Sequence, residues 1–384
     1  MIAPGAWLGL LGGGQLGRMF SMAAQSMGYR VMVVDPGAHS PAGDVADACL
    51  RADYLDSEAL ARLARDCSAV TTEFENVPAE ALRRLARDCF VSPAADSVAV
   101  AQDRIREKEF LASVVSVGDY AIVRSEADLG DTLDERLLPG ILKRSRFGYD
   151  GKGQIRVSNR DEARTAFQAL GSEPCVLERM LALECELSVI VGRSDRGQCV
   201  AYPVAENRHE RGILDISIVP ARISPRLAAQ AQEATRAVAE RLDYVGVLCV
   251  EFFVVAGRLL ANEIAPRPHN SGHYTIDACI TSQFEQQARI LARLPLGDPS
   301  IHCPAVMVNL LGELWAGGEP RWDRVLTHSR AKLHLYGKRE PRTGRKMGHF
   351  TVLGESADAA LRQALELRAA LVPQAVTAVT AGSA

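Results

Sequence analysis

Apolar and polar residues follow strand and helix periods along most of the chain. Residues 7–11 and 30–34 are short apolar runs typical of buried strands, and residues 16–27 carry apolar side chains at helical spacing. Strand, helix and strand in this order predict a βαβ unit of a parallel sheet. The same periods predict helices at 58–66, 79–88, 226–242, 281–294 and 357–371, and strands at 138–142, 176–181, 184–191, 306–311, 332–336 and 349–353. The 384 residues therefore predict a mixed α/β and α+β chain of two or three domains.

Two apolar runs separated by an Ala-Gly pair predict a β-hairpin over residues 247–264. A turn centred on Gly257 would place Glu251 across from Glu263, with Asn262 beside them. Two facing carboxylates repel each other, and a divalent cation such as Mg²⁺, which prefers oxygen ligands, would remove the conflict. An edge hairpin whose acids point into water is the alternative. The polar loop that follows offers anion and hydrogen-bond donors: Arg267, His269, Asn270, Ser271 and His273.

The loop between the first strand and the first helix is rich in glycine. Residues 12–17 read GGGQLG and fit GxGxxG, and Asp35 ends the next strand. In a dinucleotide-binding protein this aspartate would hold a ribose, so the motif is compatible with a nicotinamide-dependent oxidoreductase. Backbone N–H groups at a helix N-terminus also bind other phosphates. The loop alone therefore indicates an anion site without identifying the anion.

Two further stretches suit ligand contacts. The apolar run 69–78 ends in Glu73, Glu75 and Asn76. Parallel sheets bind ligands at the carboxyl ends of their strands, although these residues suit a helix cap equally well. Residues 143–154 combine three glycines with four cations, which favours a lid over polyphosphate above an ordinary basic turn. The absence of GKS or GKT excludes a Walker motif.

Three polar clusters follow in the second half of the chain. Glu178 lies in the run 176–181, a pattern suited to an adenine and ribose pocket. Residues 206–209 (ENRH), taken alone, predict a surface loop. A basic loop near the end is either a solvated face or a phosphate clamp. Its members are Lys338, Arg342, Arg345, Lys346 and His349.

Composition narrows the class of protein. The net charge is −3, so no broad field attracts nucleic acid or an anionic membrane. The first residues lack a basic leader, and no apolar run reaches the ~20 residues of a membrane span. Nine cysteines without a CxxC pattern are typical of a reducing compartment. We therefore expect a cytoplasmic protein.

Six stretches resemble one known family and together span nearly the whole chain. They are residues 9–19 (GLLGGGQLGRM), 72–78 (TEFENVP), 148–154 (GYDGKGQ), 184–188, 205–214 (AENRHERGIL) and 262–278 (NEIAPRPHNSGHYTIDA). They resemble the ATP-grasp superfamily and, within it, the N5-carboxyaminoimidazole ribonucleotide synthetases of purine biosynthesis. The Gln-Leu-Gly context of the glycine loop is unlike that of dinucleotide binders, which argues against a nicotinamide cofactor. A sister ATP-grasp ligase, such as a formate-dependent glycinamide ribonucleotide transformylase, is the nearer alternative.

The resemblance implies a fold and an activity. It implies a Rossmann-like pre-ATP-grasp domain at 1–95, an ATP-grasp domain at 96–295 with a lid at about 110–180, and a small β-rich C-terminal domain at 296–384. The implied enzyme uses ATP, bicarbonate and Mg²⁺, for which Mn²⁺ can substitute, to carboxylate aminoimidazole ribonucleotide through carboxyphosphate. A homodimer and a transient hand-off of the product to the downstream mutase are also implied.

The resemblance further implies site residues, position by position. ATP would contact Arg104, Lys143, Gly148, Tyr149, Asp150, Gly151, Lys152, Gly153, Gln154, Glu178, Arg179, Met180, Leu181, Glu186, His209, Asn262 and Glu263. The ribonucleotide would contact Gly14, Gln15, Leu16, Glu75, Tyr149, Asp150, Arg267, His269, Lys338, Arg345 and Lys346. Glu251 and Glu263 would bind the metal, and Lys143, Asp150, Arg267 and His269 would take part in catalysis. Phe147 replaces a glycine usual in the family, which should stiffen the lid.

Overall fold

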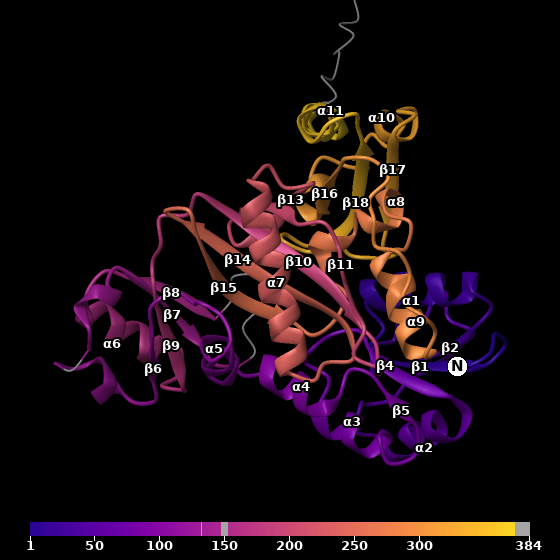
Figure 1. Ribbon diagram of the computed structural model, residues 1–384, viewed down its shortest axis with the longest axis horizontal. Helices are drawn as coiled ribbons and strands as arrows, with labels where there is room; N and C mark the ends of the chain where they lie inside the picture. Colours follow the sequence, from indigo (N-terminus) through magenta and orange to yellow (C-terminus); the bar gives the residue numbers. More distant parts are fainter. Residues whose placement is uncertain (132, 147–152, 373–384) are drawn as a thin grey trace, which may run out of the picture.

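The structure is a computed structural model that describes residues 1–131, 133–146 and 153–372. These residues form three β-sheets (Figure 1). A parallel sheet from the first part of the chain and a small antiparallel sheet lie on two sides of a large antiparallel sheet. The large sheet runs from the middle of the molecule to the upper lobe in Figure 1. The sites described below lie where these sheets meet.

The N-terminal sheet confirms the predicted βαβ unit. Its strand order is β3-β2-β1-β4-β5, and all its pairs are parallel. The strands are β1 (Trp7–Leu11), β2 (Arg30–Val34), β3 (Ala48–Leu50), β4 (Ala69–Thr72) and β5 (Phe90–Val91). The helices are α1 (Gln15–Ser26), α2 (Ser57–Asp66), α3 (Ala79–Leu85) and α4 (Ala95–Ala101). The apolar stripe of α1 is buried against β1, β2 and the later helix α9 (Gln283–Leu291).

The small sheet has the order β6-β9-β7-β8 and is antiparallel. Its strands are β6 (Tyr120–Val123), β7 (Gly140–Arg144), β8 (Gln154–Val157) and β9 (Cys175–Arg179), with the short helices η1 (Glu126–Leu129) and η2 (Glu135–Leu137) between β6 and β7. Helix α6 (Arg160–Ala169) packs its apolar side against this sheet. Helix α5 (Arg104–Ala112) connects the N-terminal sheet to it.

The large sheet has the order β15-β14-β10-β12-β13-β16-β18-β17, and β11 pairs with β10. Its strands are β10 (Cys185–Arg193), β11 (Cys199–Ala201), β12 (Ala205–Glu210), β13 (Ile213–Val219), β14 (Gly246–Val255), β15 (Arg258–Ala265), β16 (Ala305–Leu311), β17 (Ala331–Leu335) and β18 (Lys346–Leu353). The remaining helices are α7 (Pro225–Arg241), α8 (Thr275–Ala278), α10 (Asp323–Leu326), α11 (Ala357–Leu371), η3 (Asn270–Gly272) and η4 (Gly312–Trp315). Helix α7 covers β10 and β14, and α11 covers β16 and β18 (Figure 1).

Two local predictions were wrong. Residues 206–209 form part of β12 and not a surface loop, because their polar side chains find partners inside the sheet; Asn207 bonds Ser188 there. The predicted strand 349–353 is confirmed within β18, but β18 already begins at Lys346, so Lys346 and His349 do not belong to a basic loop; the ring of His349 is fully buried beside Tyr336. In both cases hydrogen bonds to distant residues compensate for the burial of polar groups.

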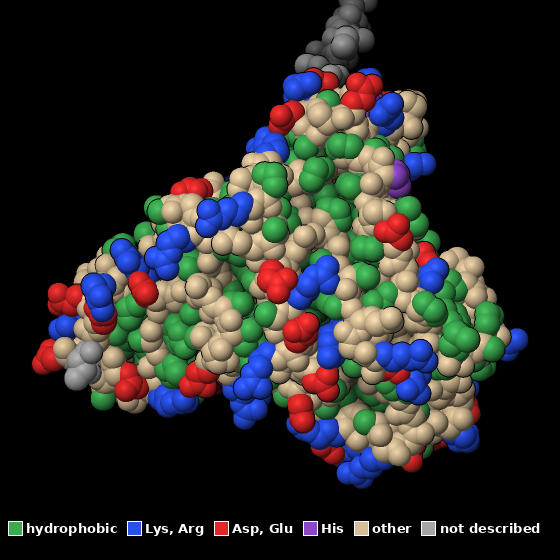
Figure 2. Space-filling view, in the orientation of Figure 1, with side chains coloured by type: hydrophobic (Ala, Val, Ile, Leu, Met, Phe, Trp, Pro, Cys, Tyr) green, Lys and Arg blue, Asp and Glu red, His purple; other side chains and the backbone are tan. Residues whose placement is uncertain are grey.

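The surface charges, the helices and the cysteines match what the composition predicts. On the face in Figure 2, acidic and basic side chains are interspersed, which keeps the field over that face weak. Among the described helices, none combines the length and the apolar content that crossing a membrane requires. The nine cysteines are free thiols.

Candidate active site

The β14–β15 hairpin places two glutamates side by side, as predicted. Its turn consists of Ala256 and Gly257, which both have positive φ, so the expected centre at Gly257 was wrong by half a residue. Phe252 pairs with Ala261, and the next pair is Glu251 with Glu263. Asn262 is therefore the extra residue of a β-bulge. The bulge restores the predicted pairing and turns both carboxylates to the same face of the sheet.

The chemistry of this pair fits a hard divalent cation. Burial, and after it the charge of Glu263, raises the pKa of Glu251 to about 7. The Oδ1 atom of Asn262 is buried and has no hydrogen-bond partner among the described residues. The Arg104 guanidinium lies 3.6 Å from Glu263 Oε2. Two carboxylates in conflict and a neighbouring unsatisfied amide oxygen form the donor set that Mg²⁺ accepts.

A chain of buried hydrogen bonds orients His269 beside Glu251. Asn207 Nδ2 donates to Ser188 Oγ at 2.9 Å, and Ser188 Oγ donates to Ser271 Oγ at 2.7 Å. Ser271 Oγ lies 2.8 Å from His269 Nδ1, and His269 Nε2 lies 3.1 Å from Glu251 Oε1. Burial, and then the charge of nearby cations, lowers the pKa of His269 well below its usual range. A neutral His269 that keeps its proton on Nε2 satisfies both contacts.

Glu186 and His209 lie next to the same acids. Their strands β10 and β12 are neighbours, and His209 Nδ1 lies 2.9 Å from Glu186 Oε2. Burial alone would lower the pKa of His209, but Glu186 and Glu251 raise it overall. The structure thus places Glu186 and His209, both predicted ATP contacts, beside the Glu251–Glu263 pair of the β14–β15 hairpin.

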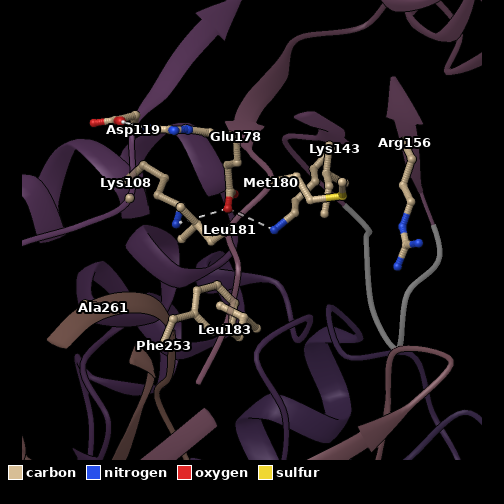
Figure 3. Close-up of a pocket in the computed structure, with 13 residues that line it drawn as sticks. Lys108, Asp119, Lys143, Arg156, Glu178, Met180, Leu181, Leu183, Phe253 and Ala261 are labelled. Atoms are coloured by element: carbon tan, nitrogen blue, oxygen red, sulfur yellow. Dashed lines mark hydrogen bonds and ion pairs between the residues drawn. The ribbon is translucent and has the colours of Figure 1, made fainter. Parts of the chain in front are cut away.

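A pocket between β9, β7 and the hairpin contains the predicted residue Glu178 (Figure 3). Lys143 Nζ donates to Glu178 Oε2 at 2.9 Å, and Lys108 Nζ lies 3.4 Å from the same oxygen. Burial would raise the pKa of Glu178, but Lys143 and Lys108 lower it to about 2. Apolar side chains line much of the rest of the pocket: Ile141, Met180, Leu181, Leu183, Phe253 and Ala261. The charged residues Asp119, Arg156 and Arg179 also line it. Apolar walls around a few fixed charges suit a base and its ribose.

Glu178→Gln is expected to weaken ADP binding about tenfold or more, because two buried ammonium groups then share a neutral partner. Isothermal titration calorimetry with ADP measures the change. Glu173→Gln is the matched control, since Glu173 is an exposed acid paired with Arg144 near the same sheet. An unchanged Kd in a folded Glu178→Gln protein would contradict this role.

The glycine loop is filled by the protein's own carboxylates. Glu73 Oε2 accepts the N–H of Gly17 at 2.8 Å, and a Cβ added at Gly14 would lie only 1.9 Å from Glu73 Oε1. Asp35, the expected ribose ligand of a dinucleotide binder, accepts the N–H of Gly13 at 2.8 Å and the hydroxyl of Tyr54 at 3.1 Å. A dinucleotide pyrophosphate would need the position that Glu73 occupies. The geometry therefore argues against nicotinamide chemistry.

Glu73→Gln is expected to raise the free energy of unfolding, relative to the parent protein, more at pH 8 than at pH 5. Burial raises the pKa of Glu73 to about 7, so the folded state loses stability as pH rises from the ordinary glutamate pKa through 7. Glutamine does not titrate, and its oxygen still accepts the Gly17 N–H. We expect the variant's free energy of unfolding, measured with urea and compared with the parent, to gain about 1–3 kcal/mol between the two pH values. Glu80→Gln, at an exposed acid of α3, should show no such gain.

Arg267 joins the hairpin side of the site to the N-terminal sheet. Its guanidinium forms a two-pronged ion pair with Glu75, with Nη2 3.1 Å from Oε1 and Nε bonded to Oε2. Burial would raise the pKa of Glu75, but Arg267 lowers it. The charge of Lys346 also contributes to lowering the pKa of Glu75 and of His269. Glu75 and Arg267, two of the predicted ribonucleotide contacts, are therefore in direct contact across the site.

Other predicted ribonucleotide contacts form a second group. Lys338 Nζ donates to Gln15 Oε1 at 2.6 Å, at the start of α1 and next to Gly14 and Leu16. Arg345 instead donates to the carbonyl of Glu340 at 2.9 Å in an exposed loop. The structure thus brings Lys338 to the glycine loop and directs the guanidinium of Arg345 to its own loop.

Some predicted residues lie outside the described part of the chain. These are Gly148, Tyr149, Asp150, Gly151 and Lys152, together with Phe147. Gly153 and Gln154 are described at the start of β8, where the carbonyl of Gly153 accepts the N–H of Arg144 at 2.9 Å. Arg179 ends β9 with an exposed side chain 3.4 Å from Asp119, and both residues line the pocket around Glu178.

Sequence reasoning missed three buried charges at the site: Glu73, Glu107 and Lys108. Glu73 belonged to a recognised acidic run, in which Glu75 was chosen. Glu107 and Lys108 lie in a helix whose sequence is highly charged, and only 4% and 2% of their surfaces are exposed. No periodic signal in α5 distinguishes them from solvated neighbours.

Comparisons with known proteins identify the class to which this fold and site belong. The sequence models of three families match: the ribonucleotide synthetase preATP-grasp domain over residues 6–102, the ATP-grasp domain over 109–284, and the phosphoribosylaminoimidazole carboxylase C-terminal domain over 305–363. The protein is an ATP-grasp enzyme. The N5-carboxyaminoimidazole ribonucleotide synthase of Bacillus subtilis (strain 168) is 42% identical over 360 residues, which are 93% of this chain and 94% of the relative. This chain belongs to the N5-carboxyaminoimidazole ribonucleotide synthase family.

A further relative and two solved structures support this family assignment. The synthase of Brucella melitensis biotype 1 is 45% identical over 354 residues, 91% of this chain and 97% of that one. An ADP complex of a synthetase of this family has a TM-score of 0.90 at 41% identity and covers 96% of this chain and 97% of its own. The Aspergillus clavatus enzyme, solved with ADP and 5-aminoimidazole ribonucleotide, has a TM-score of 0.87 at 30% identity and covers 96% and 98%.

Proposed function

We propose that this chain carboxylates the amine of 5-aminoimidazole ribonucleotide with bicarbonate and ATP, releasing ADP and phosphate in de novo purine biosynthesis. One observation carries the proposal: the hairpin that pairs Glu251 with Glu263 also contributes Phe253 and Ala261 to the charged and apolar nucleotide pocket, within a chain that matches this family almost from end to end. Relatives were solved with ADP and with ADP plus the ribonucleotide. We propose that the nucleotide binds in the pocket around Glu178, and that the ribonucleotide binds the residues around Arg267 and the glycine loop.

Glu251, Glu263 and Asn262 Oδ1 would hold Mg²⁺, for which Mn²⁺ can substitute. The cation would neutralise charge on the phosphoryl group during transfer. Lys143, held by Glu178 at the pocket, would add a positive charge on the nucleotide side.

The domain boundaries at residues 95 and 295 also stay proposals.

The chemistry would proceed in three steps. A bicarbonate oxygen attacks the γ-phosphorus of ATP, the bond to the bridging oxygen breaks, and ADP leaves carboxyphosphate behind. Carboxyphosphate breaks into CO₂ and phosphate in a site from which water is excluded. The ribonucleotide amine then attacks CO₂, and Asp150, outside the described residues, accepts its proton.

The described residues would hold the second substrate. Arg267 and His269 would bind the forming carboxylate, because one is a permanent cation and the other carries an N–H on a fixed ring, for which His269 Nε2 would have to leave Glu251. Glu75 and the glycine loop would contact the ribonucleotide from the N-terminal side. Lys338, Lys346 and Arg345 would bind its phosphate, for which Arg345 would have to leave the Glu340 carbonyl.

Incubation with ¹⁴C-bicarbonate, Mg-ATP and aminoimidazole ribonucleotide tests the proposal. The expected product is an acid-labile labelled ribonucleotide that needs all three compounds. Stable label, or turnover with formate and glycinamide ribonucleotide instead, would overturn the choice of substrate. A cytoplasmic location, a homodimer and a hand-off to the mutase are further proposals, which fractionation, light scattering and coupled-enzyme transient kinetics would test.

A further inference from the structure

The bulge in β15 exposes backbone groups at the edge of the large sheet. β15 is the end strand of its sheet, and Asn262 has no partner across β14. Helix α5 lies along this edge and supplies the missing partners. Lys108 Nζ donates to the carbonyl of Asn262 at 2.9 Å, and Glu107 Oε1 accepts the N–H of Ile264 at 2.6 Å. Two consecutive side chains, one a donor and one an acceptor, thus take the two backbone groups on either side of Glu263.

These contacts decide which way Glu263 points. Continuing the register of Phe252 and Ala261 without a bulge would pair Glu251 with Asn262. Side chains alternate between faces along a strand, so Glu263 would then face away from Glu251. The bond from the Lys108 ammonium is charge-assisted and so roughly twice as strong as a neutral one, and both bonds are buried, so that losing either would leave a buried backbone group without a partner. They therefore hold the strand in its bulged register.

Lys108 also reaches the nucleotide pocket. Its Nζ lies 3.4 Å from Glu178 Oε2, and Figure 3 shows it on the opposite side of that oxygen from Lys143. One ammonium group therefore contacts both the bulge and the acid of the pocket. Among the described residues, the side chain of Glu107 forms one hydrogen bond, which is to the bulge.

We propose that Glu107 and Lys108 are positioning residues that hold the β15 bulge, and so keep Glu263 beside Glu251 for the metal. Lys108 additionally ties this bulge to the nucleotide pocket. The inference rests on the metal site proposed above. It predicts that Glu107 affects the metal and that Lys108 affects both metal and nucleotide.

The test compares ADP binding by the full chain with Mn²⁺ and with EDTA, using calorimetry. The tightening is the Kd of ADP in EDTA divided by the Kd of ADP with Mn²⁺. Glu107→Leu should reduce this ratio about tenfold or more, as loss of a residue that orients a metal ligand does. Its ADP affinity in EDTA should stay near that of the parent. Glu107→Gln should restore the tightening, because its amide oxygen can accept the Ile264 N–H. Glu109→Leu, at an exposed acid of the same helix, is the matched control.

Lys108→Met should weaken ADP binding in EDTA and also reduce the tightening by Mn²⁺. The proposal is overturned if a folded Glu107→Leu protein keeps the parent's tightening, or if Glu107→Gln loses as much as Glu107→Leu. Should Glu107→Leu not fold, Lys108→Met with parental tightening would overturn it equally. Glu251→Gln serves as the reference: if it leaves the tightening intact, the proposed metal site has failed, whatever Glu107 does.

Discussion

Arg267→Ala is expected to lower the rate of carboxylation about 10³-fold, which is typical when a charge that stabilises a transition state is removed. The Kd of ADP should stay close to that of the parent, because Arg267 contacts Glu75 and the N-terminal side of the site. The variant should also lose about 2–3 kcal/mol of unfolding free energy, since Glu75 is left as a partly buried carboxylate without its guanidinium. Steady-state kinetics, ADP calorimetry and urea unfolding measure the three effects.

Two controls separate the chemical effect from the structural one. A Glu75→Gln, Arg267→Ala double variant should recover stability but not activity. Arg222→Ala removes a different ion pair, with Glu206, whose side chain lies on the opposite face of β12 from Asn207. It should cost stability and leave turnover near that of the parent. Loss of ADP binding in Arg267→Ala would contradict the division of roles.

Glu251→Gln is expected to reduce turnover at saturating Mg-ATP by about 10²–10³-fold, because one of two carboxylate ligands is lost. The metal-free protein should at the same time become more stable at neutral pH. Replacing Glu251 removes the repulsion from Glu263 and the burial of a charge, and glutamine preserves the shape. Kinetics over a range of Mg²⁺ concentrations and thermal unfolding in EDTA measure these opposite changes.

Glu184→Gln is the matched control for the hairpin. Glu184 Oε1 accepts the N–H of Gly257 at 3.0 Å at the turn of the same hairpin, on an exposed surface. Glutamine keeps that bond, so neither turnover nor stability should change appreciably. A Glu251→Gln enzyme with the parent's Mg²⁺ dependence would show that the facing acids serve another purpose.

Local patterns predicted much of this fold. The βαβ unit followed from short apolar runs, a glycine loop and a helical stripe, because each element buries a continuous face. The sequence also predicted that Glu251 and Glu263 face each other, although the position predicted for the hairpin turn was wrong. The actual turn is one of two residues, and the bulge at Asn262 compensates for the difference. A bulge depends on contacts outside the hairpin, here with Glu107 and Lys108, and no local pattern contains them.

The residues that escaped prediction are polar groups buried by distant parts of the chain. Lys108 is 154 positions from Asn262, and Glu107 is 157 positions from Ile264. Asn207 and His349 read as surface residues because polarity normally marks exposure, whereas both lie in the interior of the large sheet. Identification of the family supplied most site positions. The physical reason for each pairing became visible only in the structure.

ADP release measured with Mg-ATP, with and without bicarbonate and aminoimidazole ribonucleotide, tests the central claim most directly. The account predicts rapid ADP release only when bicarbonate and the ribonucleotide are both present, together with an acid-labile carboxylated product. ADP release that ignores both compounds and responds to another acid and amine would contradict it. The ATP-grasp fold would then stand, and the proposed substrates would not.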